Sequence, residues 1–116
     1  MLSTVLEAVT EAGLLSPQRL AERLNISVAA LASVLRLHRN TLANHGSPLV
    51  QERLGESARI INKASALTDD PARAVIWFRY QPIVGFDNKT AEELVAQGRS
   101  ASVLRHLEDL VDGFYA

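Results

Sequence analysis

Helix start signals recur along this chain, and little in it favours β-strands. Ser16-Pro17 and Ser47-Pro48 place a capping side chain directly before a proline, and Asp70-Pro71 repeats the pattern. A serine or aspartate at this position accepts a hydrogen bond from a free backbone N–H, and proline suits the first helical position because it has no N–H to satisfy. Apolar residues follow at helical spacing nearly everywhere, which is typical of helices with one buried face. The sequence therefore predicts an all-α fold.

The same signals divide the chain into eight short helices. The first carries Leu2, Val5, Leu6 and Val9 and is expected to end at Gly13. The next four are predicted over residues 17–24, 28–35, 39–44 and 48–66, with Ser27 as the cap of the second of these and a possible bend at Gly55 in the last.

Three further helices are predicted after Thr68-Asp69-Asp70-Pro71. One runs from Pro71 to Gln81-Pro82, where proline disfavours helical geometry at the residue before it. After a loop over 83–89, Thr90 and Glu93 form a capping box that starts a helix ending at Gly98. The last helix covers 102–112 and is expected to end at Gly113. The best internal boundary precedes residue 69, giving an N-terminal helix-turn-helix and dimerisation region over 1–68 and a helical lobe over 69–116.

Two pairs of helices could form a helix-turn-helix. One pair is 17–24 with 28–35, and the other is 28–35 with 39–44. The second is preferred, because its last helix offers Arg39, Asn40, Thr41 and Asn44 to a DNA groove while Leu42 anchors the core. Arginine, asparagine and threonine suit base edges and phosphates, whereas helix 28–35 is mostly Ala, Leu and Val. Helical bundles produce the same spacing, so plain packing stays an alternative.

The charge distribution favours a nucleic-acid partner, although the net charge of the 116 residues is only -1. Residues 16–63 hold seven basic and three acidic residues, a balance of +4, between segments with balances of -2 and -3. No acid occurs between Arg36 and Gln51, where His38 and His45 add optional charge. A cationic face on this lobe could bind phosphates, the alternative being a solvated face with scattered arginines.

The residues for catalysis or for a cofactor are missing from the sequence. There is no cysteine, the three histidines are not spaced as a helical metal pair, and the glycines stand singly. The adjacent carboxylates Asp69-Asp70 and Glu92-Glu93 lie at predicted helix starts, where capping accounts for them. Trp77 and Phe78 fit core packing. We therefore expect a protein that is not an enzyme, with no metal and no cofactor.

The chain is expected to be soluble and cytoplasmic. Its longest apolar runs, such as 74–78, are five residues, far below the ~20 needed to cross a bilayer. The N-terminus lacks the basic start of a signal peptide, and the absence of cysteine fits a reducing compartment.

The C-terminal segment carries a specific order of residues. Trp77-Phe78, Pro82 and Gly85-Phe86 come first, then residues 89–95 (Lys-Thr-Ala-Glu-Glu-Leu-Val), and finally Gly98-Arg99, Val103, Leu107 and Gly113. This order resembles the toxin-binding domain of the Xre/MbcA/ParS-like antitoxins, and residues 32–42 resemble the Xre-type helix-turn-helix that precedes it. The resemblance covers about 100 residues. In three places the chain departs from the family pattern: Ala91 replaces a common proline, Arg36 replaces the usual glycine of the turn, and 43–45 lacks paired arginines.

The resemblance implies an antitoxin of a type II toxin–antitoxin system. Such a protein would form a homodimer, block a protein toxin, suspected to be of the NAD-consuming RES type, and repress its own operon by binding operator DNA. Carried over to this chain, the DNA-binding residues would be Arg36, Arg39, Asn40, Thr41 and Asn44. The toxin-binding residues would be Lys89, Gly98, Arg99, Phe114, Tyr115 and Ala116.

The last three residues suggest one way to block a toxin. A short tail after Gly113 could place Tyr115 and the terminal carboxylate in the toxin's active-site cleft, whereas Phe114 fits better as the end of the last helix's apolar stripe. The main alternative to an antitoxin is a stand-alone transcriptional regulator whose C-terminal lobe only dimerises. A small enzyme is the third possibility, and it would need a carboxylate site that the sequence does not offer.

Overall fold

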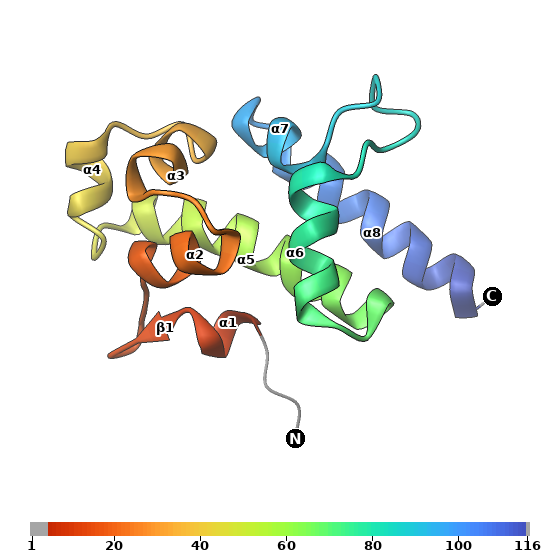
Figure 1. Cartoon of the computed structure of the whole chain (residues 1–116), viewed down its shortest axis with the longest axis horizontal. Helices are drawn as coiled ribbons and strands as arrows, with labels where there is room; N and C mark the ends of the chain where they lie inside the picture. The colour runs from red at the N-terminus through yellow and green to blue at the C-terminus, as the bar shows by residue number, and fades with distance from the viewer. Residues whose placement is uncertain (1–4, 116) are drawn as a thin grey trace.

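The computed structural model of the chain describes residues 5–115, and it confirms an all-α fold (Figure 1). Within those residues there are eight helices and one small two-stranded sheet. In chain order the elements are α1 (Val5–Ala8), β1 (Thr10–Glu11), β2 (Leu14–Leu15), α2 (Pro17–Leu24), α3 (Val28–Val34), α4 (Arg39–Ala43), α5 (Pro48–Thr68), α6 (Pro71–Tyr80), α7 (Ala91–Ala96) and α8 (Ser100–Tyr115).

The predicted capping residues start their helices as expected. The Oγ atoms of Ser16, Ser27 and Ser47 each accept a hydrogen bond from the backbone N–H three residues on, which satisfies one of the free donors of a first helical turn. Asp70 caps α6 through the N–H of Ala72. Thr90 and Glu93 bond each other's backbone N–H groups in the predicted capping box.

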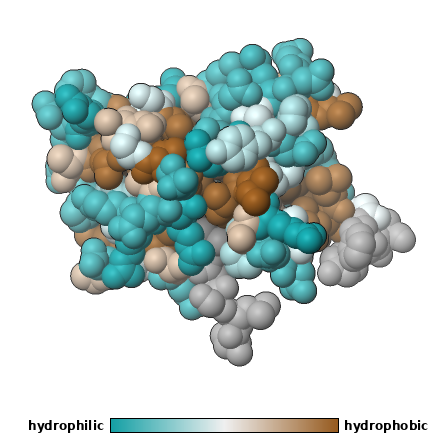
Figure 2. All heavy atoms as spheres, viewed as in Figure 1, coloured by the Kyte–Doolittle hydropathy of each residue, from teal (hydrophilic) through white to brown (hydrophobic). Residues whose placement is uncertain are grey.

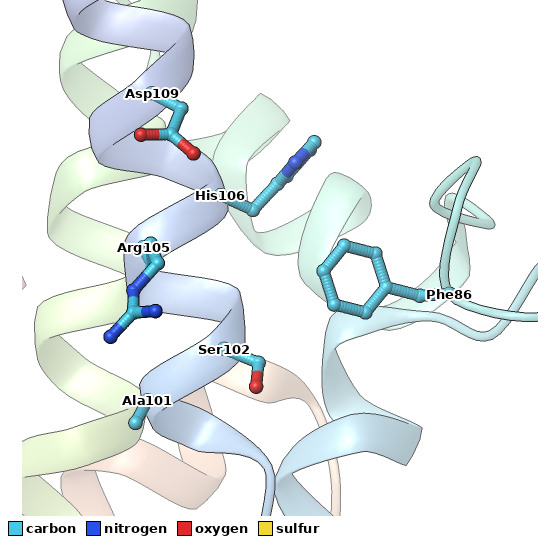
Figure 3. Close-up of a pocket in the computed structure, with 6 residues that line it drawn as sticks. All are labelled: Phe86, Ala101, Ser102, Arg105, His106 and Asp109. Atoms are coloured by element: carbon cyan, nitrogen blue, oxygen red, sulfur yellow. The ribbon is translucent and has the colours of Figure 1, made fainter.

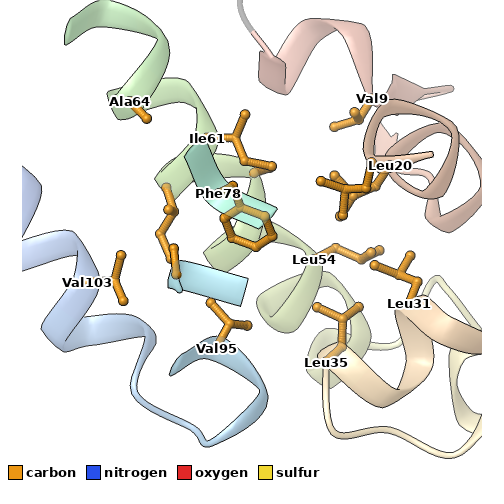
Figure 4. Packing of buried hydrophobic residues seen from close by; sticks show 14 of the residues in the cluster. Val9, Leu20, Leu31, Leu35, Leu54, Ile61, Ala64, Phe78, Val95 and Val103 are labelled. Atoms are coloured by element: carbon orange, nitrogen blue, oxygen red, sulfur yellow. The ribbon is translucent and has the colours of Figure 1, made fainter. Parts of the chain in front are cut away.

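The long helix α5 holds the two parts of the chain together. In Figure 1 it runs from behind α2 and α3 to α6 and α8, and its 21 residues carry a row of fully buried side chains that includes Leu54, Ile60 and Ile61. Figure 4 shows Leu20 and Leu31 from the N-terminal part, and Phe78 and Val103 from the C-terminal part, around this helix. One buried apolar cluster therefore runs across the boundary before residue 69.

The prediction that the first helix extends to Gly13 was wrong. Helix α1 ends at Ala8, and Thr10–Glu11 pairs antiparallel with Leu14–Leu15 in a hairpin. Ala12 and Gly13 form its turn with φ of +53° and +82°, and two consecutive positive φ angles are what a tight type I′ turn requires. Gly13 thus reverses a hairpin instead of ending a helix.

The expected end of the last helix was also wrong. Helix α8 runs from Ser100 through Gly113 to Tyr115, and Gly113 does not have the positive φ of a helix-ending glycine. The backbone of Phe114 and Tyr115 continues the helix, so these two residues do not form the predicted tail. Ala116 lies outside the described residues.

Candidate DNA-binding and partner-binding surfaces

Helix α4 presents the polar side chains that the sequence assigned to DNA. Arg39, Asn40, Thr41 and Asn44 are all exposed, and none has a side-chain hydrogen bond or ion pair to another described residue. Leu42 is buried and anchors the helix, as predicted. By contrast, the exposed residues of α3 are Ala29, Ala30 and Ser33, which offer little hydrogen-bonding capacity. The structure therefore leaves α4 as the better candidate for reading DNA.

His38 caps the N-terminus of α4. The Nδ1 atom of His38 accepts a hydrogen bond from the backbone N–H of Asn40 at 3.1 Å, and His38 itself has the extended backbone of an N-cap. The His38 side chain thus satisfies one of the free backbone N–H groups in the first turn of α4.

Arg36 differs from the other predicted DNA-binding residues in its backbone conformation and in the contact that its side chain makes. It has a left-handed backbone, with φ of +61°, in the turn where the family pattern has glycine. Its guanidinium lies against Gly98: a Cβ atom added at Gly98 would come within 2.7 Å of Arg36 Nη1 and 3.1 Å of its Cζ. One residue assigned to DNA and one assigned to the toxin thus meet in space, 62 positions apart in the chain.

Two hydrogen bonds surround this contact. Arg53 Nη1, from α5, donates to the carbonyl of Leu35 at 2.7 Å, and Ser100 Oγ donates to Glu56 Oε1 at 3.0 Å. A cavity of about 220 Å³ lies between the groups, lined by Leu35, Arg36, Glu52, Arg53, Glu56, Val95, Gly98, Ser100 and Ala101. The α3–α4 turn, the middle of α5 and the α7–α8 link therefore meet at one junction.

Part of the cationic charge of residues 16–63 is engaged within the protein. Arg19 donates to the carbonyl of Thr10 and lies 3.4 Å from a carboxylate oxygen of Glu11, and Arg53 donates to the carbonyl of Leu35. Arg23 and Arg39 are exposed and have no such partner among the described residues. The positive charge available to an external anion is consequently smaller than the residue count suggests.

The predicted toxin-binding residues do not form one cluster. Lys89 closes the 83–89 loop, since its N–H donates to Phe86 and its carbonyl accepts from Ile83. The guanidinium of Arg99 lies 5.5 Å from the centre of the Phe86 ring, so Lys89 and Arg99 both lie close to Phe86. Tyr115 is at the opposite end of α8, about 22 Å from Ser100, because an α-helix rises about 1.5 Å per residue.

An exposed apolar surface of the C-terminal lobe was missed by the sequence reasoning. Ile76 and Tyr80 on α6 are 58% and 62% exposed, and Val84 in the following loop is 86% exposed. On the face shown in Figure 2, hydrophobic residues gather over α6. The i, i+4 spacing of Ile76 and Tyr80 beside the buried Phe78 could have indicated a second apolar face, but the sequence reasoning considered only the core packing of Trp77 and Phe78.

A groove of about 340 Å³ lies between α8 and the 83–89 loop (Figure 3). Phe86 forms one wall and packs edge-on against His106, with 5.6 Å between ring centres. In Figure 3 the side chains of Arg105 and Asp109 project from α8 on the other side, and they extend in different directions. The groove combines an aromatic wall with one cation and one anion, which does not select a ligand class.

Another polar contact joins the two parts of the chain. Arg79 on α6 donates through Nη1 to the carbonyl of Leu24 at 2.8 Å, and its Nε lies 3.4 Å from Glu92 Oε2 without hydrogen-bond geometry. Burial raises the pKa of Glu92 above its ordinary value, although the charge of Arg79 works in the opposite direction.

Three of the four carboxylates in the two adjacent pairs have structural partners. Asp70 caps α6 and Glu93 belongs to the capping box, as predicted, while Glu92 faces Arg79. Asp69 instead lies at the end of α5, with a left-handed backbone. No cluster of three or more metal-ligating side chains occurs in the described part of the chain.

In residues 5–115 no helix combines the length and the apolar character that a membrane span requires. Comparison with protein families, with curated proteins and with solved structures finds no match to the chain.

Proposed function

We propose that this protein is the antitoxin of a type II toxin–antitoxin system, which binds and blocks a protein toxin, of the RES type, through its C-terminal lobe. The observation that carries the proposal is the exposed apolar pair Ile76 and Tyr80 on α6, with Val84 also exposed in the loop that follows. It lies within the segment that resembles the toxin-binding domain. Large apolar and aromatic side chains that stay in water on the free protein are typical anchors for a protein partner.

The remaining residues of the resemblance fit an architectural role. Leu94, Val103 and Leu107 are buried, and Gly98 ends α7 with a φ of +79°. There the N–H of Arg99 bonds the carbonyl of Leu94 and the N–H of Gly98 bonds that of Val95, a Schellman ending that favours glycine. These residues build the lobe, so the partner would contact the side chains between them.

The second part of the proposal is that α4 binds operator DNA and that the protein represses its own operon as a homodimer. Arg39, Asn40, Thr41 and Asn44 support it, because they are exposed and their side chains make no hydrogen bond or ion pair to another described residue. A dimer would place two copies of α4 about one DNA turn, ~34 Å, apart.

Growth rescue tests the toxin-binding part. The chain is co-expressed with the product of the adjacent gene, either unchanged or as Ile76→Lys. A charge in the middle of an apolar interface removes a contact of the kind that dominates binding, so Ile76→Lys is expected to lose rescue and to weaken the complex by about 30-fold or more.

Leu49→Lys is the matched control, because Leu49 is an exposed leucine of comparable exposure, 44%, in the N-terminal part. It is expected to rescue growth like the unchanged protein. Rescue by Ile76→Lys at the unchanged level would contradict the assignment of the surface, and a lack of any complex with the unchanged protein would contradict the antitoxin function.

A stand-alone transcriptional regulator is the second candidate, and the same α6 surface supports it, since a second copy could cover Ile76 and Tyr80. In that case the purified chain binds its upstream DNA without a partner, and Ile76→Lys converts a dimer into a monomer in analytical ultracentrifugation. An antitoxin whose α6 surface is reserved for the toxin keeps its oligomeric state in this variant.

A further inference from the structure

We propose that Arg36 is a positioning residue: its guanidinium packs against Gly98 of the C-terminal lobe, and this contact holds α4 in place. Arg36 would then act on DNA affinity through α4 and not by contacting phosphate. The functional part of this inference rests on the proposed DNA binding by α4, whereas its structural part can be tested without DNA.

The backbone at Arg36 depends on its surroundings. A residue with a Cβ atom in the left-handed region costs about 1–2 kcal/mol relative to the right-handed one, and such residues persist where neighbouring structure holds them. Arg36 has φ of +61° in the turn that joins α3 to α4. The direction in which the chain enters α4 is therefore set at a strained position.

Two lobes of the protein hold that position. Arg53 of α5 binds the carbonyl of Leu35 at 2.7 Å, directly before Arg36. The side chain of Arg36 itself extends to Gly98, in the link between α7 and α8. A cation is also favoured near the C-terminal end of α7, where the backbone carbonyls carry partial negative charge.

Gly98 is needed for two separate reasons. Its φ of +79° suits glycine in the Schellman ending of α7, and the absence of a side chain leaves room for the guanidinium. Gly85 has a similar φ of +92°, but an added Cβ there would meet nothing within 4 Å. Comparing the two glycines separates the backbone requirement from the contact with Arg36.

Helix α4 has little to fix it besides the turn. It has only five residues, too few for appreciable stability of its own, and Leu42 is its single buried side chain. We therefore expect a displacement of Arg36 to move and loosen α4.

Hydrogen exchange of the Leu42 amide tests the structural part, because this N–H bonds the carbonyl of His38 in the first turn of α4. Gly98→Ala is expected to speed this exchange about tenfold relative to Gly85→Ala, since the new methyl group displaces Arg36. Arg36→Ala, which keeps the left-handed backbone requirement, is expected to have the same effect.

The double variant Arg36→Ala/Gly98→Ala decides whether the two residues act together. If they do, its exchange equals that of Arg36→Ala alone, apart from the increase that Gly85→Ala also shows. Equal Leu42 exchange in Gly98→Ala and Gly85→Ala, or independent effects that multiply in the double variant, would overturn the inference.

Salt titration of DNA binding tests the functional part. The logarithm of the DNA-binding constant falls linearly with the logarithm of the salt concentration, and removing one phosphate contact makes this slope shallower by about one. We expect Arg36→Ala to weaken binding of the upstream DNA without changing this slope, and Gly98→Ala to do the same, while Arg39→Ala lowers the slope. A lower slope in Arg36→Ala would make Arg36 a phosphate contact. If the unchanged protein binds no DNA, the proposed function fails at α4, and the exchange result still decides the contact between Arg36 and Gly98.

Discussion

Glu92 and Glu93 are neighbours in the chain, yet their surroundings move the pKa of the two carboxyls in opposite directions. Glu92 is partly buried beside Arg79, and burial raises its pKa above the ordinary value of 4.5. Glu93 accepts the backbone N–H of Thr90, and this hydrogen bond lowers its pKa. A hydrogen bond to the charged form stabilises it, and removal from water destabilises it.

These directions predict how each carboxyl changes stability with pH. Because the folded pKa of Glu93 is lowered, its contribution is present above pH 4.5 and is lost as the pH falls through the folded pKa. Because the folded pKa of Glu92 is raised, its protonated form is favoured in the folded state, and that contribution is lost as the pH rises through the folded pKa. Carboxyl ¹³C shifts followed by NMR should show Glu92 titrating at a higher pH than Glu93.

Thr90→Ala separates the two causes. It removes the N-cap side chain, which costs about 1 kcal/mol. The pKa of Glu93 should move only part of the way toward the ordinary value, because the side-chain hydrogen bond of Thr90 is lost while the backbone N–H of residue 90 remains, and Glu92 should keep its raised pKa. Titration of both carboxyls at the same pH in the unchanged protein would contradict this account of the capping box.

Helix starts and helix ends differ in how well the sequence predicts them. Ser16, Ser27 and Ser47 cap their helices as expected, because an N-cap depends on a side chain and a bond three residues away. A glycine, in contrast, is compatible with several backbone conformations. Gly98 ends α7, Gly13 forms a hairpin turn and Gly113 continues α8, and nothing in the local sequence separates the three cases.

Substitution of Gly113 distinguishes a helical glycine from a helix-ending one. Within a helix, alanine is more favourable than glycine by about 0.5–1 kcal/mol, and a Cβ atom at Gly113 would meet nothing within 4 Å. Gly113→Ala is therefore expected to raise the melting temperature by roughly 2–4 °C, measured by circular dichroism. Had Gly113 the left-handed backbone of a helix end, the same change would lower it, as is expected for Gly98→Ala.

At the scale of the whole molecule, the sequence could not predict how the two predicted sets of functional residues relate. The polar surface of α4 and the buried Leu42 follow from local pattern, and both are present. The contact between Arg36 and Gly98 does not follow from local pattern, because it joins a turn and a helix end 62 positions apart. A contact of this kind depends on the packing of α3 against α7, which no periodicity in either segment specifies.

The shared core predicts that residues 5–115 unfold as one unit, even though two functional surfaces are assigned to different parts. The buried cluster contains Leu20 and Leu31 from one part and Phe78 and Val103 from the other, and Arg79 binds the carbonyl of Leu24 across the boundary. Separating the parts would expose this apolar surface to water, at about 25 cal/mol for each Å². Neither part therefore has a route to unfold alone at low cost.

Trp77 makes the test simple, because it is the single tryptophan of the chain and lies on α6 in the C-terminal part. In a urea titration its fluorescence reports that part, whereas the far-ultraviolet circular dichroism reports all helices. The two midpoints are expected to coincide, as a two-state transition requires. If the fluorescence midpoint fell at a different urea concentration from the dichroism midpoint, the parts would be separate folding units. The junction at Arg36 and Gly98 would then be too weak to hold α4 from the C-terminal lobe.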